Sequence, residues 1–462
     1  MKIAIYGGSF DPVHEGHTGA IEHLAWLFDK VIVLPAGHSP SKSGASASNK
    51  QRLEMLQKAL SIDTGAEILK KIEIDTQELE RPGPSYSIYT VQNTKEKYPD
   101  AEIYLCVGQD KIKSLHKWHK WDELKSLCKF VIFRRTNYLV SAHMSTFSKE
   151  YISCFDDWES EHSTSTDQER IDSIFNVVDS DVRSKMGAIG LVYNKSDLEK
   201  YDFCVLRRSF PAISSTAVRV ASHTETVQLW LPCDFWSDND VREETKFVVN
   251  DYIIKNNLYS EYNHLNNALH NSIYHLSEDR ISHIERAILN ASILASIHGA
   301  DIKKVVTAMY LHDIAKSLSV ERLKALGVND VDLAEIAKLP ASIQHSLGGV
   351  YIAQMHFDIQ DNEILDAIKY HTTGRPDMTD IEMIVYLADA TEYGRLDELS
   401  EKGIDISPIL KIAKTAFDDA NLKLAMRLAL QDSVASLKAR NMSIHPMTLE
   451  ALEYYESIEE IL

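Results

Sequence analysis

One stretch constrains the fold of this chain more than any other: residues 3–17, which read I-A-I-Y-G-G-S-F-D-P-V-H-E-G-H. The apolar run at residues 3–6 predicts a buried strand, and the two glycines after it predict a turn. Beyond the Asp-Pro pair, apolar residues recur at helical spacing, so a helix is expected to begin near His17. A helix N-terminus attracts phosphate because its first N–H groups lack partners within the helix. His14 and His17 lie in the turn that enters this helix, which predicts a site for a nucleotide phosphate chain.

Strand-like and helix-like segments alternate along residues 1–135. The expected strands are residues 31–34, 72–74, 103–107 and 130–133, and the expected helices are residues 49–60, 88–98 and 121–127. This alternation predicts an α/β doubly wound parallel sheet that binds its ligands at the carboxyl ends of the strands. The loop with Gly108 and Asp110 would share that edge with the opening loop. A Rossmann dehydrogenase fits poorly because the chain contains no G-x-G-x-x-G.

The composition limits the class of protein. A chain of 462 residues is expected to form two or three domains, and 44% hydrophobic residues indicate a globular protein. The net charge of −19 argues against nucleic-acid binding, so phosphate would be bound by local geometry. The five cysteines show no C-x-x-C pairing, and no signal peptide or membrane-spanning run is evident. We therefore expect a reduced, soluble, cytoplasmic protein without nucleic-acid or membrane partners.

The opening block resembles the H-x-G-H signature of the nucleotidyltransferase superfamily, and specifically that of the bacterial nicotinate mononucleotide adenylyltransferases. Five further blocks follow in that family's order: R-L-E-M-L from Arg52, R-P-G-P-S-Y-S from Arg81, V-G-Q-D from Val107, W-H-K-W from Trp118 and I-S-S-T-A-V-R from Ile213. The resemblance covers about residues 1–135 and 203–260. It implies transfer of AMP from ATP to nicotinate mononucleotide with Mg²⁺, which gives deamido-NAD and pyrophosphate.

The same resemblance implies roles for particular residues. The residues that would stabilise charge on the triphosphate are His14, His17, Lys42 and Arg219. The residues that would contact the nucleotides are Gly8, Ser9, Phe10, Ser85, Tyr86, Ser87, Thr90, Gly108, Asp110, Trp118, Ser214, Ser215 and Thr216. For Trp118, packing of a helix against the sheet is an equal alternative, since Trp121 lies three residues away. Transfer to phosphopantetheine or nicotinamide mononucleotide by the same chemistry is also left open.

Residues 136–202 look longer than the family norm and are rich in Ser, Thr and acidic residues. We expect an inserted flap or a partly helical surface excursion there, with helices near residues 171–178 and 181–190. A helix at residues 247–258 would end the first domain, residues 1–260. A polar, Asn-rich linker at residues 261–267 would lead to an all-α second domain, residues 268–462.

Two aspartates and four histidines of the second domain are expected to face inward from five helices. His312, for example, continues an apolar stripe from Val305, and His371 continues one from Ile364. A charged carboxylate seldom faces a core unless it is paired or binds a metal, so convergence of these groups predicts a metal site. The candidate ligands are His283, His312, Asp313, His345, His371 and Asp389.

The order H…H-D…H…H-T-T-G…D resembles the HD-domain phosphohydrolases, most closely the branch of symmetrical diadenosine tetraphosphatases. The resemblance covers about residues 268–455 and implies hydrolysis of diadenosine tetraphosphate to two ADP. It also implies a pair of ions, iron or another divalent transition metal, with Asp313 as the bridging ligand. Candidate phosphate contacts are Lys316, Arg375 and Arg395, with ordinary solvated charge as the alternative.

Taken together, the residues predict a bifunctional enzyme, an adenylyltransferase fused to a metal-dependent phosphohydrolase. Its partners would be small-molecule nucleotides: ATP, nicotinate mononucleotide and diadenosine tetraphosphate. The alternative keeps the adenylyltransferase but makes the second domain a regulatory or nucleotide-sensing module of little catalytic activity. A homo-oligomer is left open.

Overall fold

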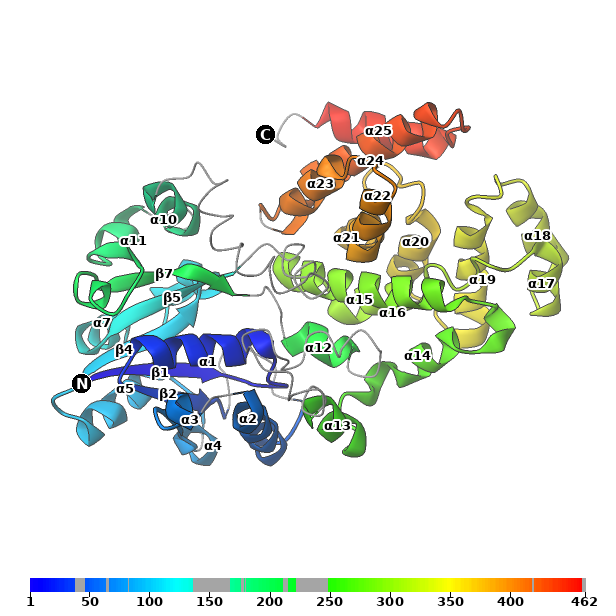
Figure 1. The fold of residues 1–462 in the computed structure, drawn as a ribbon. Helices are drawn as coiled ribbons and strands as arrows, with labels where there is room; N and C mark the ends of the chain where they lie inside the picture. The colour runs from blue at the N-terminus through cyan, green and yellow to red at the C-terminus, as the bar shows by residue number, and fades with distance from the viewer. Residues whose placement is uncertain are drawn as a thin grey trace. The chain divides into compact units, whose positions relative to one another are not determined.

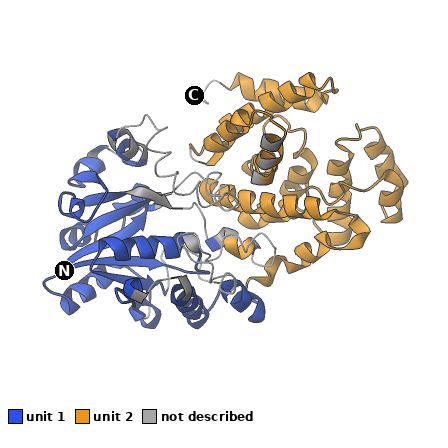
Figure 2. Cartoon of the chain, in the orientation of Figure 1, with its two compact units in different colours: residues 1–215, 228–258 blue, residues 216–227, 259–462 orange. Residues whose placement is uncertain are grey.

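The computed structural model describes residues 1–37, 46–63, 66–81, 83–135, 167–175, 178, 180–210, 215–221, 248–417 and 419–458. The chain divides into two compact units, coloured separately in Figure 2. Unit 1 comprises residues 1–215 and 228–258, and unit 2 comprises residues 216–227 and 259–462.

Unit 1 is built on a seven-stranded parallel sheet in the order β3-β2-β1-β4-β5-β7-β6. Strands β1, β2, β4, β5 and β7 are labelled in Figure 1. The strands are β1 (Lys2–Gly8), β2 (Lys30–Pro35), β3 (Ile72–Ile74), β4 (Glu102–Gly108), β5 (Lys129–Arg135), β6 (Ile189–Val192) and β7 (Phe203–Phe210). The helices that carry or adjoin candidate site residues are α1 (Glu15–Leu27), α2 (Asn49–Asp63), α4 (Gln77–Glu80), α5 (Ser87–Lys97) and α7 (Trp121–Leu127). Helix α12 (Ser215–Ala221) also carries candidate residues, and its residues after Ser215 are assigned to unit 2. The expected doubly wound α/β fold is confirmed.

The strand order reverses at β1, with β2 on one side of it and β4 on the other. Gly8 at the end of β1 pairs with Pro35 at the end of β2, and Tyr6 pairs with Cys106 of β4. In open α/β sheets, ligands bind outside the carboxyl ends of the strands where the order reverses. The loops after β1 and β4 therefore lie at the expected binding edge.

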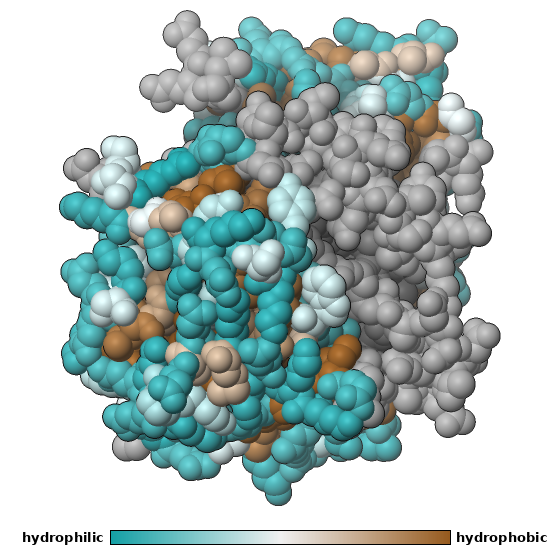
Figure 3. Space-filling view, turned by 60° about the vertical axis from the view of Figure 1, so that its left-hand side comes forward, coloured by the Kyte–Doolittle hydropathy of each residue, from teal (hydrophilic) through white to brown (hydrophobic). Residues whose placement is uncertain are grey.

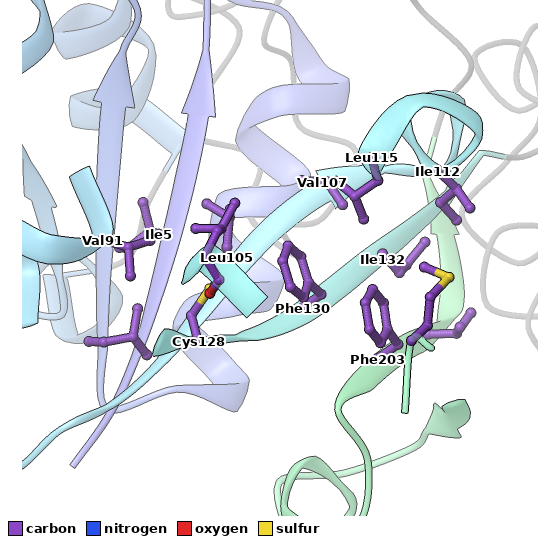
Figure 4. Close-up of a cluster of buried hydrophobic side chains, with 14 of the residues drawn as sticks. Ile5, Val91, Leu105, Val107, Ile112, Leu115, Cys128, Phe130, Ile132 and Phe203 are labelled. Atoms are coloured by element: carbon purple, nitrogen blue, oxygen red, sulfur yellow. The ribbon is translucent and has the colours of Figure 1, made fainter. Parts of the chain in front are cut away.

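A cluster of buried apolar side chains supports one face of this sheet (Figure 4). The Phe130 and Phe203 rings of β5 and β7 stack with centroids 4.8 Å apart. Ile5 of β1 and Leu105 of β4 contribute to the same cluster, which also contains Val91 of α5. Alternate residues of each strand point to opposite faces of the sheet. The same strands therefore contribute side chains to this cluster on one face and to the packing against α1 on the other.

The structure corrects the prediction for the second half of the 136–202 segment. Helices α10 (Asp167–Phe175) and α11 (Ser180–Ser184) are present, but the expected helix over residues 181–190 is wrong at its end. Residues 189–192 form strand β6, which extends the central sheet beyond β7. Phe175 and Leu191 are buried in the same apolar cluster, so this part of the segment belongs to the core rather than to a surface excursion.

Unit 2 is helical, and its described residues contain no strand. Its helices are α14 (Asn263–Leu269), α15 (Glu278–His298), α16 (Ile302–Leu311), α17 (Val320–Ala325), α18 (Asp330–Ala337), α19 (Gln344–Phe357), α20 (Asn362–Tyr370), α21 (Asp380–Ala390), α22 (Tyr393–Glu401), α23 (Ser407–Phe417), α24 (Leu422–Ala439) and α25 (Pro446–Ser457). The expected all-α architecture is confirmed.

The prediction of a polar linker at residues 261–267 also needs correction. Most of it belongs to helix α14, in which Leu265 and Leu269 are buried. These two leucines lie four residues apart, one helical turn, so the helix has an apolar face despite its asparagines. Because the stretch is rich in asparagine, it was expected to be a polar linker despite the helical spacing of these leucines.

Among the described residues on the face shown in Figure 3, most of the surface is hydrophilic, and apolar side chains are exposed in separate areas. Among the described residues, no helix is both long enough and apolar enough to span a bilayer.

A buried arginine joins two loops at the binding edge of the sheet. Arg52 of α2 is fully buried. Its Nη1 donates to the carbonyl of Ser9 at 2.5 Å, and its Nη2 donates to the carbonyl of Ala36 at 2.8 Å. The Asn49 side chain accepts a further bond from Nη2 at 2.8 Å. The guanidinium therefore holds the loop after β1 and the chain after β2 in a fixed relation.

Arg52→Ala is expected to lower the free energy of unfolding of unit 1 by roughly 3 kcal/mol, because two buried carbonyl groups lose their donor. Urea denaturation of the full-length chain, with hydrogen exchange reporting on unit 1, measures the change. Lys70→Ala is the control, since its exposed ion pair with Glu67 should contribute less than about 1 kcal/mol. Equal stability of the two variants would contradict the role assigned to Arg52.

Candidate functional site

The loop between β1 and α1 brings two histidines into contact. His14 is the N-cap residue of α1, and its backbone N–H donates to Nδ1 of His17 at 3.3 Å. Their rings stack with centroids 3.7 Å apart, and the His17 ring also meets the edge of Phe10 at 4.9 Å. Because Nδ1 of His17 accepts a hydrogen bond, the neutral ring carries its proton on Nε2. That N–H is suited to donate to a phosphate oxygen.

Backbone groups hold the rest of this loop. The carboxylate of Asp11 is buried and accepts the N–H groups of Ser46 at 2.7 Å and Ala47 at 3.0 Å. Gly8 lies against the ring of Phe10, where an added Cβ would approach the ring to 3.0 Å. A side chain at Gly8 would therefore displace Phe10, which contacts His17.

A second polar network lies where the acceptor nucleotide was expected. The N–H of Gly37 donates to Oγ of Ser85 at 3.2 Å, and Oγ1 of Thr90 donates to Oε1 of Glu78 at 2.7 Å. Thr90 is buried and its hydroxyl proton is donated to Glu78, so its position favours a supporting role over contact with a substrate. Burial raises the pKa of Glu78, and the bond from Thr90 opposes that rise.

The neighbouring aromatic residues are arranged more simply. The rings of Tyr86 and His119 stack with centroids 4.5 Å apart, so Tyr86 presents a supported aromatic surface. Trp118 and Trp121 are partly buried against the apolar cluster of the sheet. For Trp118 this packing favours the structural alternative. Glu78, which belongs to no motif, was not among the expected site residues, and neither was His119, although His119 lies within the W-H-K-W block.

The remaining candidates of the first domain differ in how the structure describes them. Ser87 begins α5, and Gly108 ends β4 at the binding edge. Oγ of Ser215 donates to the carbonyl of Pro12 at 3.0 Å, so this hydroxyl anchors the loop that precedes His14. Arg219 lies in the last turn of α12. The candidates outside the described residues are Lys42 and Ser214, together with the side chains of Asp110 and Thr216.

In unit 2 the structure brings together all six side chains named as candidate ligands. Their nitrogen and oxygen atoms form three overlapping groups, and within each group the atoms lie within 4.8 Å of one another. The groups are His283 with His312 and Asp313, then His312 with His371 and Asp389, and finally Asp313 with His345 and His371. Helices α15, α19 and α21 supply His283, His345 and Asp389, and the ends of α16 and α20 supply the others.

The histidines are oriented so that Nε2 faces the cluster. Nδ1 of His312 is 2.7 Å from the carbonyl of Met309, and Nδ1 of His371 is 2.7 Å from the carbonyl of Ile368. A carbonyl only accepts, so each Nδ1 must carry a proton, and the neutral ring keeps a lone pair on Nε2. Among the described residues, Nε2 of His312 has no hydrogen-bond partner. This is the form of histidine that binds a metal ion.

The two carboxylates lie between these nitrogens. Oδ1 of Asp313 is 3.1 Å from Nε2 of His345 and 3.6 Å from Nε2 of His371. Oδ2 of Asp313 is 3.8 Å from Nε2 of His312, and Oδ1 of Asp389 is 2.9 Å from Nε2 of His283. The two oxygens of Asp313 thus lie near different histidines. An oxygen and imidazole donor set without thiolates fits a divalent transition metal.

The protonation states also suit a cation. Burial alone would raise the pKa of Asp313, but the histidines and Lys316 around its carboxylate hold that pKa well below its usual range. Burial lowers the pKa of His345 to about 4, so this ring is neutral near pH 7. Burial would lower the pKa of His283, yet its carboxylate partners raise it to about 9. An ion bound at Nε2 of His283 would take the place of a proton.

Two cationic side chains border the cluster. Nη1 of Arg280 is 2.7 Å from Oδ2 of Asp313. Nζ of Lys316 is 3.4 Å from Oδ1 of Asp313 and 3.0 Å from Nε2 of His345. Both side chains are about one-third exposed, so each could also reach a ligand in solvent. Arg280 was not among the expected site residues, although it begins the R-I-S-H run that contains His283.

The two other arginines named as phosphate contacts are placed differently. Arg375 forms a two-pronged ion pair with Glu382, with Nε–Oε1 at 2.6 Å and Nη2–Oε2 at 2.7 Å. Its Nη1 donates to the carbonyl of Pro376 at 3.2 Å. Because its donors are used within the protein, this arrangement favours a structural role for Arg375. The side chain of Arg395, in α22, is exposed.

Comparison with known proteins assigns a family to each part of the chain. Residues 5–221 match the cytidylyltransferase-like family, and residues 280–394 match the HD domain. An HD domain implies a divalent metal ion, which the six clustered side chains fit.

Relatives extend this assignment. A Mycoplasma genitalium protein named "Probable nicotinate-nucleotide adenylyltransferase/Ap4A hydrolase" is 28% identical over 93% of this chain and 97% of its own length. An Aliarcobacter butzleri protein named "Probable nicotinate-nucleotide adenylyltransferase" is 40% identical over 30% of this chain and 74% of its own length. A predicted HD-superfamily hydrolase of Clostridium acetobutylicum, described as involved in NAD metabolism, is 28% identical over 43% of this chain and 97% of its own length, with a TM-score of 0.35. By its likeness to the Aliarcobacter butzleri protein, the chain belongs to the nicotinate-nucleotide adenylyltransferase family, and its second unit carries an HD domain.

Proposed function

We propose that this chain is a bifunctional enzyme. Its first part transfers AMP from ATP to nicotinate mononucleotide, and its HD domain hydrolyses diadenosine tetraphosphate symmetrically to two ADP. The observation that carries the proposal is that a relative spanning 93% of the chain has both activities in its name. The paired histidines of the β1–α1 loop and the six-residue cluster of unit 2 supply a suitable site for each reaction.

Adenylyl transfer needs positioning more than acid–base chemistry. The phosphate of nicotinate mononucleotide is already a nucleophile; it would attack the α-phosphorus of ATP and displace pyrophosphate. Mg²⁺ bound with the nucleotide would supply positive charge to the phosphates. His14 and His17 would stabilise the charge that develops on the leaving group, with His17 donating through Nε2. Arg52 and Asp11 would hold the loop in position, and the supported ring of Tyr86 would face the pyridine ring.

Symmetrical hydrolysis needs an activated water. Divalent ions at the cluster would lower the pKa of a bound water and neutralise the oxygens of the displacement. The residues that would hold them are His283, His312, Asp313, His345, His371 and Asp389. Lys316 and Arg280, at the border of the cluster, would bind the polyphosphate chain. We propose iron, with manganese, cobalt or nickel as chemically similar alternatives.

Activity measurements on the full-length chain test the proposal. Values of kcat/KM for nicotinate mononucleotide, nicotinamide mononucleotide and phosphopantetheine identify the acceptor, and preference for either of the last two would overturn the assignment. Metal analysis and hydrolysis of diadenosine tetraphosphate decide between a phosphohydrolase and a regulatory module. The complete set of clustered ligands favours the phosphohydrolase.

His17→Ala is expected to reduce kcat/KM for adenylyl transfer by about 100-fold or more, because a donor to the leaving pyrophosphate is lost. Hydrolysis of diadenosine tetraphosphate by the same variant should be unchanged. His23→Ala is the matched control: His23 also lies on α1, but it stacks on the exposed Trp26 with centroids 6.1 Å apart. An unchanged rate of synthesis in His17→Ala would refute the site.

Asp313→Asn is expected to remove bound metal and hydrolysis while sparing adenylyl transfer, because a neutral amide would hold divalent ions more weakly than the carboxylate. Metal content per chain, determined after dialysis, is the primary measurement. Asp380→Asn, the same change at the exposed start of α21, serves as the control. Stoichiometric metal in Asp313→Asn would count against the bridging role.

A further inference from the structure

A buried carboxylate lies behind His283 and takes no part in either set of site residues described above. Glu392 follows the C-terminal end of α21 and is 2% exposed. It lies three residues after Asp389, but it faces the opposite nitrogen of the same imidazole. Nε2 of His283 is 2.9 Å from Asp389, and Nδ1 is 3.2 Å from Oε1 of Glu392.

The other oxygen of Glu392 is held firmly. Oε2 accepts a bond from Nε of Arg286 at 2.6 Å and one from the N–H of Gly394 at 2.9 Å. Arg286 lies on α15 three residues after His283, so the same helix supplies the imidazole and the guanidinium. One carboxylate oxygen is therefore anchored, and the remaining oxygen is directed at Nδ1 of His283.

Gly394 contributes by having no side chain. A Cβ at this position would lie 2.4 Å from Nη2 of Arg286, which is closer than atoms can approach. Any larger residue would push the guanidinium away from Glu392. The absence of a side chain at Gly394 therefore leaves room for the guanidinium of Arg286, which balances the charge of Glu392.

Burial of an ionised carboxylate such as Glu392 costs free energy, so its presence suggests a functional role. A buried ion pair seldom stabilises a fold more than apolar residues of the same volume would. His312 and His371 orient their Nδ1 protons with backbone carbonyls, which need no buried charge. Of His283, His312 and His371, only His283 has a carboxylate beside its Nδ1. A carboxylate that accepts a hydrogen bond from Nδ1–H makes Nε2 a more basic ligand and fixes the direction of its lone pair.

We propose that Glu392, anchored by Arg286 and by the N–H of Gly394, is a positioning residue that raises the affinity of His283 for the metal ion. This inference rests on the proposed metal centre and goes beyond it, because it assigns part of the metal affinity to a residue that does not touch the ion. Loss of such a partner typically weakens metal binding by about 10- to 100-fold.

The test uses Mn²⁺ as the probe on the full-length chain after removal of bound metal. Glu392→Gln keeps the size of the side chain and removes its charge. The dissociation constant for Mn²⁺, from equilibrium dialysis, is expected to rise about 10-fold or more. The Mn²⁺ concentration that half-saturates hydrolysis should rise by the same factor, and the rate at saturating Mn²⁺ should fall much less. Adenylyl transfer should be unchanged.

Gly394→Ala is a second route to the same effect, since it leaves Glu392 in place and displaces Arg286. It keeps the inference testable if Glu392→Gln fails to fold. Glu382→Gln is the matched control: this carboxylate is equally buried, belongs to α21 and pairs with Arg375, and the contacts given above include none to a candidate ligand. Its Mn²⁺ dissociation constant should equal that of the unaltered chain.

The outcomes separate the inference from the function on which it rests. If the unaltered chain binds no Mn²⁺, iron, cobalt or nickel, the proposed metal centre fails and the inference fails with it. If the unaltered chain binds Mn²⁺ and a folded Glu392→Gln or Gly394→Ala binds it equally well, only the inference is overturned. Weaker binding in Glu382→Gln to the same extent would show a general effect of lost stability and would also overturn it.

Discussion

An ionised carboxylate that is almost entirely removed from water determines the arrangement of unit 2. Asp313 is 2% exposed, and an unpaired charge at such a position would cost several kcal/mol. Groups from several segments contact this carboxylate, among them the guanidinium of Arg280 on α15 and the imidazole of His345 on α19. The helices that carry these groups must therefore converge on one point. The same convergence creates a site for a divalent ion, because the ion would add positive charge where the carboxylates need it most.

Unit 1 solves the same problem for a charge of the opposite sign. The guanidinium of Arg52 is fully buried, and backbone carbonyls rather than a carboxylate satisfy it. Those carbonyls belong to the chain segments that leave β1 and β2, at the edge where the strand order reverses. Burial of one charge thus becomes a means of holding the loop that carries His14 and His17. Asp11 contributes in the same way by accepting backbone N–H groups.

The two sites suit two different demands of phosphate chemistry. In adenylyl transfer the nucleophile is ready-made, so a rigid loop with donors for the leaving pyrophosphate is sufficient. In polyphosphate hydrolysis the nucleophile is water, which needs a strong local field to ionise near pH 7. The edge of a parallel sheet supplies the first through loops and a helix N-terminus. The interior of a helical bundle supplies the second, because several helices can each direct one side chain to a common point.

Much of this organisation is written locally in the sequence. The strand at the amino end, the paired histidines after it and the doubly wound sheet follow from short apolar runs alternating with helical spacing. The inward positions of His312 and His371 follow from the apolar stripes that precede them, because spacing along a helix decides which face a residue occupies. The metal cluster was therefore predictable as a set of six residues, although no residue of the set is informative alone.

Other features depended on neighbours that the sequence does not reveal. Residues 189–192 resemble many short apolar runs, and only the free edge of β7 makes them strand β6. The sequence made Arg375 a candidate phosphate contact, but in the structure its guanidinium pairs with the carboxylate of Glu382.

The sequence by itself determined the two fold classes, the loop of His14 and His17, and the six residues of the cluster, because periodicity and motif spacing are local properties. Only the tertiary structure decided which charges meet. His283 and Glu392 lie 109 residues apart, and their contact exists because the packing of α15 against α21 brings a carboxylate to the back of an imidazole. Pairing of buried charges is decided by distance in space, which no local pattern encodes.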